Sequence, residues 1–344
     1  VVEPVANDTA TGAASVPAEA ATTGDEEIAL PVEMLRQLDI KGDFRINALK
    51  IKQYDVNQLL MSLVAQKGNI NIKPLSMKML EGQLSSAINM NVQSAKPAYA
   101  IDMNVKQVQA GPVVNPFLDG IMGEKPVKMQ GAVNMTMDVK TAGSSINQLK
   151  KASNGKIVLD MKETRVDGFD PEYYMRSSIA EEIGGKDSGL SQSIAGGYDP
   201  RQVTVFDKIY STVNLANGRA STSDFLMDSK RVHVGAKGYA DIIENALDVT
   251  SSVKLPRGKT VTEKILSSPL YVRIHGPFDA LKYDIDKKRI RESTKDVLEQ
   301  QAKEKLEEEK QKLKQEAEEK AREELKRTED KLKDKLQDKL KGLF

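Results

Sequence analysis

The stretch GAVNMTMDVK, residues 131–140, alternates strictly between apolar and polar side chains. Its apolar positions are Val133, Met135, Met137 and Val139, and each residue between them is polar. A period of two is typical of a β-strand with one apolar and one solvated face, whereas a helix would spread these apolar side chains around its circumference. The stretch therefore predicts a half-buried strand.

The same alternation recurs in residues 82–92, 99–105, 155–166, 217–227 and 231–242. A turn containing Lys96-Pro97 joins the first two segments as a hairpin. In residues 42–51 the phase slips between Ala48 and Leu49, which predicts a bend or a new strand, because a shift of one residue reverses every side chain. We predict a mostly β fold: an elongated, twisted antiparallel sheet forming an apolar groove, with short helical insertions and a long charged C-terminal α-helix.

Helical patterns interrupt the predicted strands rather than alternate with them, which disfavours a βαβ fold. Residues 31–38 form a short predicted helix, with Pro31 in its first turn. Asp55 is a good N-cap for residues 56–66, where we predict a helix that covers the sheet as a lid. The stripe of this helix is Val56, Leu59, Leu60 and Leu63.

Further elements follow from turn residues and composition. Residues 69–81 are predicted as two strands around Lys73-Pro74, residues 112–123 as a helical connection, and a second helix starts near Ser144. Residues 170–183 are predicted as helical, with Pro171 near the start, and the glycine-rich residues after them as flexible. From Lys287 onward Lys, Glu, Leu and Ala predominate, which predicts one helix about 80 Å long.

These shifts divide the chain into five parts. They are a disordered linker at residues 1–27, the first part of a β domain at 28–169, a helical and glycine-rich insertion at 170–202, the C-terminal part of the β domain at 203–287, and a long amphipathic charged helix at 288–344.

The composition argues against several functional classes. The 344 residues carry a net charge of +1, only 5% aromatic residues and no Trp, so neither a basic field nor stacking platforms favour a nucleic-acid partner. The absence of Cys excludes disulfides, thiolate metal sites and cysteine nucleophiles. No apolar run approaches the roughly 18 residues of a spanning helix, and because the chain starts at Val1 we expect any anchor to lie upstream.

No residues form a recognisable catalytic constellation. His233 and His275 lie in separate predicted strands, without a pattern of paired carboxylates, and we interpret them as ordinary strand residues. The serines lack a G-x-S-x-G context. We therefore expect no enzyme activity, no metal and no cofactor.

The order of motifs in the second half of the chain resembles a known family. These motifs are NGKIVLDMKETRVDGFDPEYYMR at 154–176, a strand and turn at 206–220, DFLMDS at 224–229, GYADIIENALDV at 238–249 and SPLYVRIHGPFDALKYDID at 268–286. Together they resemble the C-terminal region of AsmA family proteins of Gram-negative bacteria, over about residues 30–287. One glycine of the family pattern is missing after Gly168, where Phe169 follows directly.

The resemblance implies a periplasmic body, anchored in the inner membrane by an N-terminal segment absent from this chain. It also implies kinship with bridge-like lipid transfer proteins, whose bent sheets form an apolar groove for acyl chains. The expected function is phospholipid transport and support of outer-membrane biogenesis. The expected partners are a phospholipid or another acyl-chain lipid, the membrane and outer-membrane assembly factors.

Two sets of residues are candidates for lipid contact. The first would line the groove: Leu84, Ile88, Met90, Ile101, Met103, Met135, Met137, Ile157, Leu159 and Met161. Periodicity alone fits a dry core equally well, and only the resemblance favours the groove. The alternative function is a structural scaffold or assembly factor for outer-membrane proteins that conducts no lipid.

The second set lies near the end of the predicted C-terminal helix, where leucines recur at helical spacing between lysines. Such a helix can lie on a lipid surface while the lysines extend to water. The alternative is a solvated helix held by pairs such as Glu299–Lys303. The residues of this predicted membrane-surface helix are Leu332, Leu336, Leu340, Leu343 and Phe344.

Overall fold

A computed structural model describes residues 27–28, 30–122, 127–184, 189–195 and 203–341. Its strands form one sheet of 14 strands in which all pairs are antiparallel. The strands are β1 (Asp39–Ile51), β2 (Tyr54–Gln66), β3 (Asn69–Met79), β4 (Gly82–Asn91), β5 (Ala98–Gln109), β6 (Lys128–Gln130), β7 (Ala132–Ala142), β8 (Asn154–Asp167), β9 (Val203–Ala216), β10 (Arg219–Asp228), β11 (His233–Asp241), β12 (Ala246–Lys254), β13 (Leu270–Pro277) and β14 (Lys282–Ile285). The predicted mostly β, antiparallel fold is confirmed.

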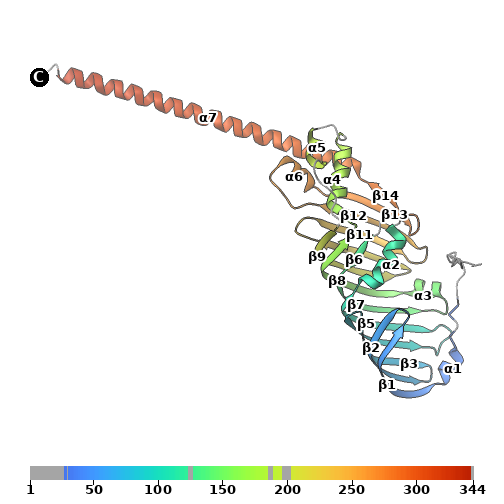
Figure 1. Ribbon diagram of the computed structural model, residues 1–344. Coiled ribbons are helices and arrows are strands. Elements are labelled where there is room, and N and C mark those ends of the chain that lie inside the picture. Colours follow the sequence, from blue (N-terminus) through green and yellow to red (C-terminus); the bar gives the residue numbers. More distant parts are fainter. Residues whose placement is uncertain (1–26, 29, 123–126, 185–188, 196–202, 342–344) are drawn as a thin grey trace, which may run out of the picture.

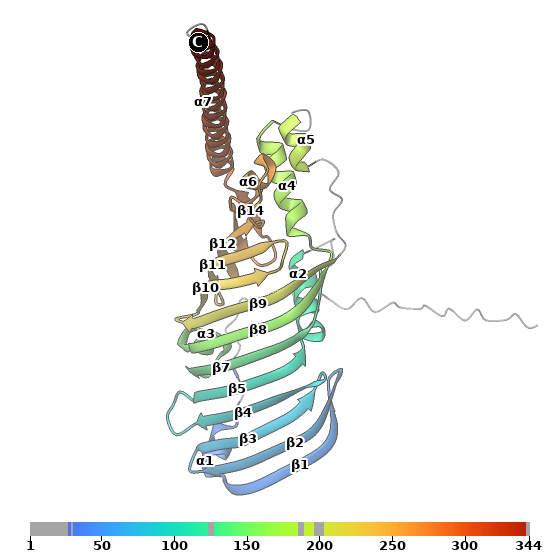
Figure 2. The same ribbon diagram turned by 90° about the vertical axis from the view of Figure 1, so that its left-hand side faces the viewer.

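The topology of the sheet is a simple meander. Each strand pairs with the next along the chain, except that the short β6 pairs with β8 outside the main path. Figure 2 shows the strands as the rungs of a ladder that rises from β1 at one end toward β12 and β14 at the other. The sheet is open, because β1 and β14 each have only one neighbour.

Seven helices are described, and they lie at the margins of the sheet. They are α1 (Val32–Gln37), α2 (Gly111–Met122), α3 (Ile146–Ala152), α4 (Pro171–Glu182), α5 (Gly189–Ala195), α6 (Val261–Leu266) and α7 (Lys287–Lys341). In Figure 2, α1 and α3 lie beside one set of strand ends and α2 beside the other. The helices α4, α5 and α6 gather at the end formed by the last strands (Figure 1).

Helix α7 confirms the long helix predicted from composition, with 55 residues. Its first turns are held on the body of the protein, because Ile290 and Thr294 are buried and Lys264 of α6 forms an ion pair with Glu304 at 2.9 Å. Beyond Glu304 every described side chain is exposed. The rest of α7 therefore projects away from the sheet, as Figure 1 shows.

The main hydrophobic core lies between the last strands and the helices at this end. Met175 of α4, Ile194 of α5 and Phe206 of β9 are fully buried in it, together with Ile265 of α6. Helix α4 has Pro171 in its first turn, as predicted, and Asp170 caps its first backbone N–H groups. The core also contains Ile290 of α7, so it holds α4, α5, α6 and the first turns of α7 on one end of the sheet.

The helix predicted at residues 56–66 is wrong, because this segment is strand β2. Leu59, Met61, Leu63 and Ala65 alternate on one face, and Gln58, with φ of 52°, forms a bulge that brings Val56 onto the same face. A bulge inserts one extra residue into the strand, so the apolar residues on its two sides are spaced as they would be in a helix. The segment is a strand of the sheet and not a lid over it.

Two further predictions need correction. Residues 69–81 hold one strand, β3, whose pairing with β4 shifts between Ile72 and Leu75, instead of two strands. The glycine-rich part of the insertion contains α5, and its residues 185–188 and 196–202 lie outside the described residues. Helix α6 was not predicted. The linker predicted at residues 1–27 also lies outside the described residues, except Glu27, which bridges to Ser145.

Candidate functional site

The ten predicted groove residues all lie on one face of the sheet. Side chains that are directly opposite in an antiparallel pair share a face, so the register can be followed from strand to strand. One row of opposite residues contains Met103, Met137 and Ile157, and a second contains Leu84, Val105, Met135 and Leu159. Ile88 and Ile101 are opposite each other, as are Met90 and Tyr99, and Met161 is opposite Val133. We call this surface the apolar face.

Bulges keep the apolar face continuous where the phase of a strand would otherwise reverse. In β5 the pairing with β7 shifts between Val105 and Val108, and Gln107 between them has φ of 54°. Because one residue is accommodated in the bulge, Val105 and Val108 point to the same face, and both are 7% exposed. The strand is thereby apolar on one side over its whole length.

The ten residues do not share one environment. Met161 is 2% exposed and belongs to the main core, and Leu159 packs against that core. The other eight lie outside it, and each is partly exposed. Met161 therefore occupies a dry core, whereas the middle of the apolar face, on β4, β5, β7 and the first half of β8, is accessible.

Helices border the apolar face along both sets of strand ends. On one side Val114 and Leu118 of α2 pack against the core. On the other, the Thr141 hydroxyl donates to the Leu149 carbonyl of α3 at 2.6 Å, and the Arg36 Nε of α1 donates to the Val92 carbonyl at 2.8 Å. Between these borders the apolar face extends across the strands for about 24 Å from β3 to β9, at the usual strand spacing. We call this strip of the apolar face the apolar channel.

On the apolar face, β9 and β10 carry two neighbouring hydroxyls and β11 carries mostly small side chains. On β9 and β10 the hydroxyls of Ser211 and Thr222 form a hydrogen bond of 3.0 Å. On β11 the face is made of small residues, namely Val234, Ala236, Gly238 and Ala240. The side chains of the apolar face are therefore smaller over β11 than over β4–β8.

Tyr99 places one polar group on the apolar face. Its hydroxyl is buried and has no hydrogen-bond partner among the described residues. Burial raises the pKa of Tyr99, so the phenol stays protonated at physiological pH. The hydroxyl is an unused donor at the border of the channel near α3, since Tyr99 is opposite Thr141.

The opposite face of the sheet is polar and carries two shallow hollows of about 300 and 380 Å³. Asn104 and Thr136, which are directly opposite each other, line the larger hollow. Asp102, Asp138 and Lys140 line the smaller one and are exposed. The predicted separation of one apolar and one polar face is thus present in the folded protein.

Each histidine has a carboxylate partner that sequence spacing did not reveal. His233 Nδ1 contacts the Asp228 carboxylate, and His275 Nε2 lies 2.8 Å from Asp284 Oδ2. Both pairs join neighbouring strands. Across the residues that the structure describes, no group of three or more His, Asp or Glu side chains could hold a metal ion.

The predicted membrane-surface residues are described only in part. Leu332 and Leu336 are 56% and 57% exposed on α7. The side chain of Leu340, and the whole of Leu343 and Phe344, lie outside the described residues. No described helix is both long enough and apolar enough to cross a membrane.

Sequence reasoning missed part of the channel. Val105, Val139 and Val213 continue the rows that it identified, and their alternation was visible in the sequence. The channel residues of β2 were assigned to a helix, so Met61 and Leu63 were not recognised as part of the sheet. A register argument through β3 places both on the apolar face, opposite Leu75 and Ile72.

An open, single-layer antiparallel sheet with one accessible apolar face defines the structural class of this protein. Comparison with family models gives a match to the AsmA family over residues 6–225. The match covers more than half of the chain, and the chain belongs to the AsmA family, whose members are typically associated with the cell envelope. Comparison with curated proteins and with solved structures gave no match.

The family match differs in extent from the resemblance noted in the sequence. It begins earlier, at residue 6, and ends at residue 225 within β10. The motifs at 238–249 and 268–286 therefore lie outside it. The strands β11–β14 nevertheless continue the same sheet with unbroken antiparallel pairing.

Proposed function

We propose that this protein binds and transfers phospholipid in the periplasm, with the acyl chains in the apolar channel and the headgroups in water. In this way it supports phospholipid transport and outer-membrane assembly. An N-terminal segment outside this chain would anchor it in the inner membrane. Membership of the AsmA family supports this proposed function.

The observation that carries the proposal is the partial exposure of eight apolar residues in an unbroken register across β4, β5, β7 and β8. Apolar surface of this extent is costly to leave in water. An acyl chain that covers it gains about 0.8 kcal/mol for each buried CH₂. The channel needs no specific polar contacts along its length, so it suits chains of varied structure.

The rows of side chains also give the channel a direction. Opposite residues in successive strands, such as Met103, Met137 and Ile157, form a line across the strands. An extended acyl chain would lie along such a line, and could slide from one row position to the next. Met supports this, because its side chain is flexible and polarizable.

A scaffold or assembly factor that conducts no lipid is the second candidate. It is favoured by the dry core that covers Met161 and by the exposed helix α7, which offers a long surface for partners. In this case the accessible part of the apolar face would be covered by a protein partner.

Two measurements separate these functions. Mass spectrometry of the purified, detergent-free protein should detect co-purified phospholipid. A photo-crosslinking residue at position 103 or 137 should label lipid in the presence of membranes, and the same residue at position 104 or 136 should not. Equal labelling from both faces, or no lipid at all, would reject the channel.

A further inference from the structure

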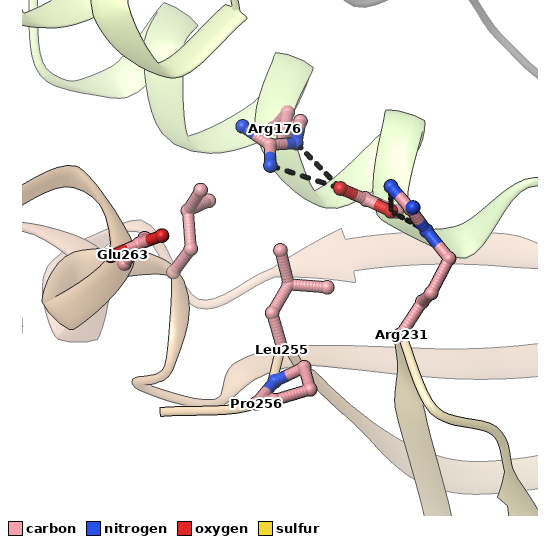
Figure 3. Close-up of a pocket in the computed structure, with 7 residues that line it drawn as sticks. Arg176, Arg231, Leu255, Pro256 and Glu263 are labelled. Carbon is pink, nitrogen blue, oxygen red and sulfur yellow. Dashed lines mark hydrogen bonds and ion pairs between the residues drawn. The ribbon is translucent and has the colours of Figure 1, made fainter. Parts of the chain in front are cut away.

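The two open edges of the sheet end differently. The edge strand β14 has only four residues, and α7 follows it after Asp286. Helices α4, α5 and α6 gather at this end, where Arg176 of α4 and Arg231 of the turn after β10 both donate to Glu172 (Figure 3). At the other end β1 has one neighbour, β2, and no described element lies beyond its outer edge (Figure 2). The edge of β1 is therefore open to solvent.

Strand β1 has a long edge that is suited to pairing with another strand. It has 13 residues, 11 of them exposed, and it contains no Pro. Natural edge strands are commonly short, or carry Pro or inward-pointing charges, because their unpaired backbone N–H and C=O groups bind other strands. The apolar face of β1 carries no charge over residues 40–46, and Ile40, Phe44 and Ile46 on it are 42%, 43% and 42% exposed. Helix α1 leaves this edge uncovered, because its Arg36 donates to the Val92 carbonyl after β4.

The turn after β2 shows which residues of β1 direct their backbone groups outward. This turn has two residues, Lys67 and Gly68, so Gln66 directs its N–H and C=O groups toward β3. The residues in the opposite phase of β2 direct theirs toward β1, and these are Ala65, Leu63 and Met61, opposite Ile40, Gly42 and Phe44. The backbone groups of β1 that point away from the sheet therefore belong to the alternate residues Lys41, Asp43 and Arg45. These residues would form the hydrogen bonds to an added strand.

The charges at this edge are complementary to a second copy of the same edge. We propose that β1 pairs antiparallel with β1 of a second copy of this chain, around a two-fold axis at Phe44. In this register Asp43 is opposite Arg45 of the second copy, and the symmetry repeats the contact on the other side of the axis. An axis at Asp43 or at Arg45 would instead place two like charges directly opposite each other, which is destabilising. In the described part of the chain neither Asp43 nor Arg45 forms an ion pair, although the Ser62 hydroxyl donates to Asp43.

This pairing continues the apolar face from one copy into the other. A two-fold axis perpendicular to the sheet keeps the apolar faces of both copies on the same side. At the axis the two Phe44 rings meet in a non-hydrogen-bonded pair, where opposite side chains approach most closely. Phe44 also ends a row of opposite residues that crosses the apolar channel, namely Phe44, Met61, Leu75, Ser86, Met103 and Met137. The two channels thus join through Phe44. This consequence rests on the proposed function, whereas the pairing itself does not.

Analytical ultracentrifugation of the full chain, without lipid or detergent, tests the pairing. The wild type should change from one chain to two between about 1 and about 100 μM, as expected for a small interface. Asp43→Arg and Arg45→Asp should each weaken the dimer about tenfold or more, because like charges then lie opposite each other, whereas Lys78→Asp on β3 should change it less than about twofold. An equal mixture of the variants at 43 and 45 should dimerise as the wild type does, because opposite charges meet again at both contacts. A mixture that stays as single chains would overturn the proposal.

A single introduced cysteine tests the position of the axis, since the chain contains no Cys. Phe44→Cys should form a disulfide-linked dimer on mild oxidation, because the two copies of residue 44 are about 4.5 Å apart between their Cα atoms. The control Ile40→Cys lies on the same face, and Ile40 is as exposed as Phe44. Its two copies are about 27 Å apart in the proposed register, so it should not crosslink. Equal crosslinking from both positions, or none from position 44, would overturn the two-fold pairing.

Other occupants of the edge give different results. If the wild type stays a single chain at every concentration and the amides of Lys41, Asp43 and Arg45 exchange slowly with deuterium, a different strand covers the edge and the dimer is overturned. A single chain with rapid exchange at these amides would overturn it as well. None of these measurements involves lipid, so a failure of the pairing leaves the proposed lipid function intact. Conversely, a dimer without co-purified lipid would support the pairing and reject the channel.

Discussion

Met103 on β5 and Met137 on β7 lie directly opposite each other on the apolar face, outside the main core. Met103→Asp or Met137→Asp would place a charge where the proposed acyl chain lies and remove its apolar contact. Loss of one buried Met costs about 1.5–3 kcal/mol, so lipid capture should fall about tenfold or more. Capture is measured as lipid that co-purifies per protein.

The matched controls are Asn104→Asp and Thr136→Asp, which lie opposite each other on the polar face. They introduce the same charge in the same two strands and should capture lipid as the wild type does. If the variants at 103 and 137 unfold while the controls fold, the two methionines belong to a dry core and the channel is rejected.

Phe206 on β9 is fully buried, and its strand neighbour Val205 on the other face is 53% exposed. Phe206→Ala should destabilise the protein by about 3–5 kcal/mol, because it leaves a cavity between the sheet and the helices. Val205→Ala should cost less than about 1 kcal/mol. Urea denaturation followed by circular dichroism gives both values, and similar costs would show that the core is misplaced.

Thr260 caps helix α6 in a capping box with Glu263, and α6 buries Ile265 and Leu266 in the core. Thr260→Ala should cost about 0.5–2 kcal/mol, since the N–H group of Glu263 loses its acceptor. Thr260→Ser keeps the hydroxyl and should restore most of this stability. The comparison of thermal midpoints checks the effect, and an Ala variant as stable as the Ser variant would contradict it.

Asp248 on β12 accepts from Arg273 of β13 at 2.9 Å through both of its oxygens, and this contact lowers the pKa of Asp248. A lowered pKa in the folded state stabilises the fold above the unfolded value of about 3.9, and this stabilisation is lost as the pH falls through the folded value. Asp248→Asn should therefore lower the thermal midpoint at neutral pH, and the difference should disappear once the pH has fallen below the lowered pKa of Asp248. Asp279→Asn serves as the control, and no ion pair involving Asp279 is found in the described part of the chain. A difference that persists in acid would exclude this ion pair as its cause.

The sequence allowed the architecture to be predicted wherever strands keep a strict period of two. The face containing Met135 and Met137 could be assigned because β7 has no bulge within residues 133–141. The error at residues 56–66 has a local cause, since the bulge at Gln58 places Val56 on the same face as Met61 although the two are five positions apart. Pairing with β1 and β3 determines the structure of residues 56–66, and the sequence of one segment does not show which strands it will pair with.

The candidate site, like the fold, could be predicted from the sequence only in part. The apolar face follows from alternation alone, but its exposure depends on what covers it, as the contrast between Met161 and Met137 shows. Helix α6 could have been predicted, because Thr260 and Glu263 have the spacing of a capping box. The ion pair of Arg231 with Glu172 joins residues 59 positions apart, and no local pattern predicts it.

The last prediction concerns the outer part of α7, where Leu332 and Leu336 lie one turn apart and are exposed. If these turns lie on a lipid surface, Leu332→Gln with Leu336→Gln should weaken binding of the full chain to anionic vesicles about tenfold. The control Leu306→Gln with Leu313→Gln changes two leucines that are equally exposed in the middle of the helix, and should have no effect. A peptide of residues 328–344 should gain helical circular dichroism on the same vesicles. Without that gain, and with equal behaviour of both double variants, α7 is a charged spacer that holds its end away from the sheet.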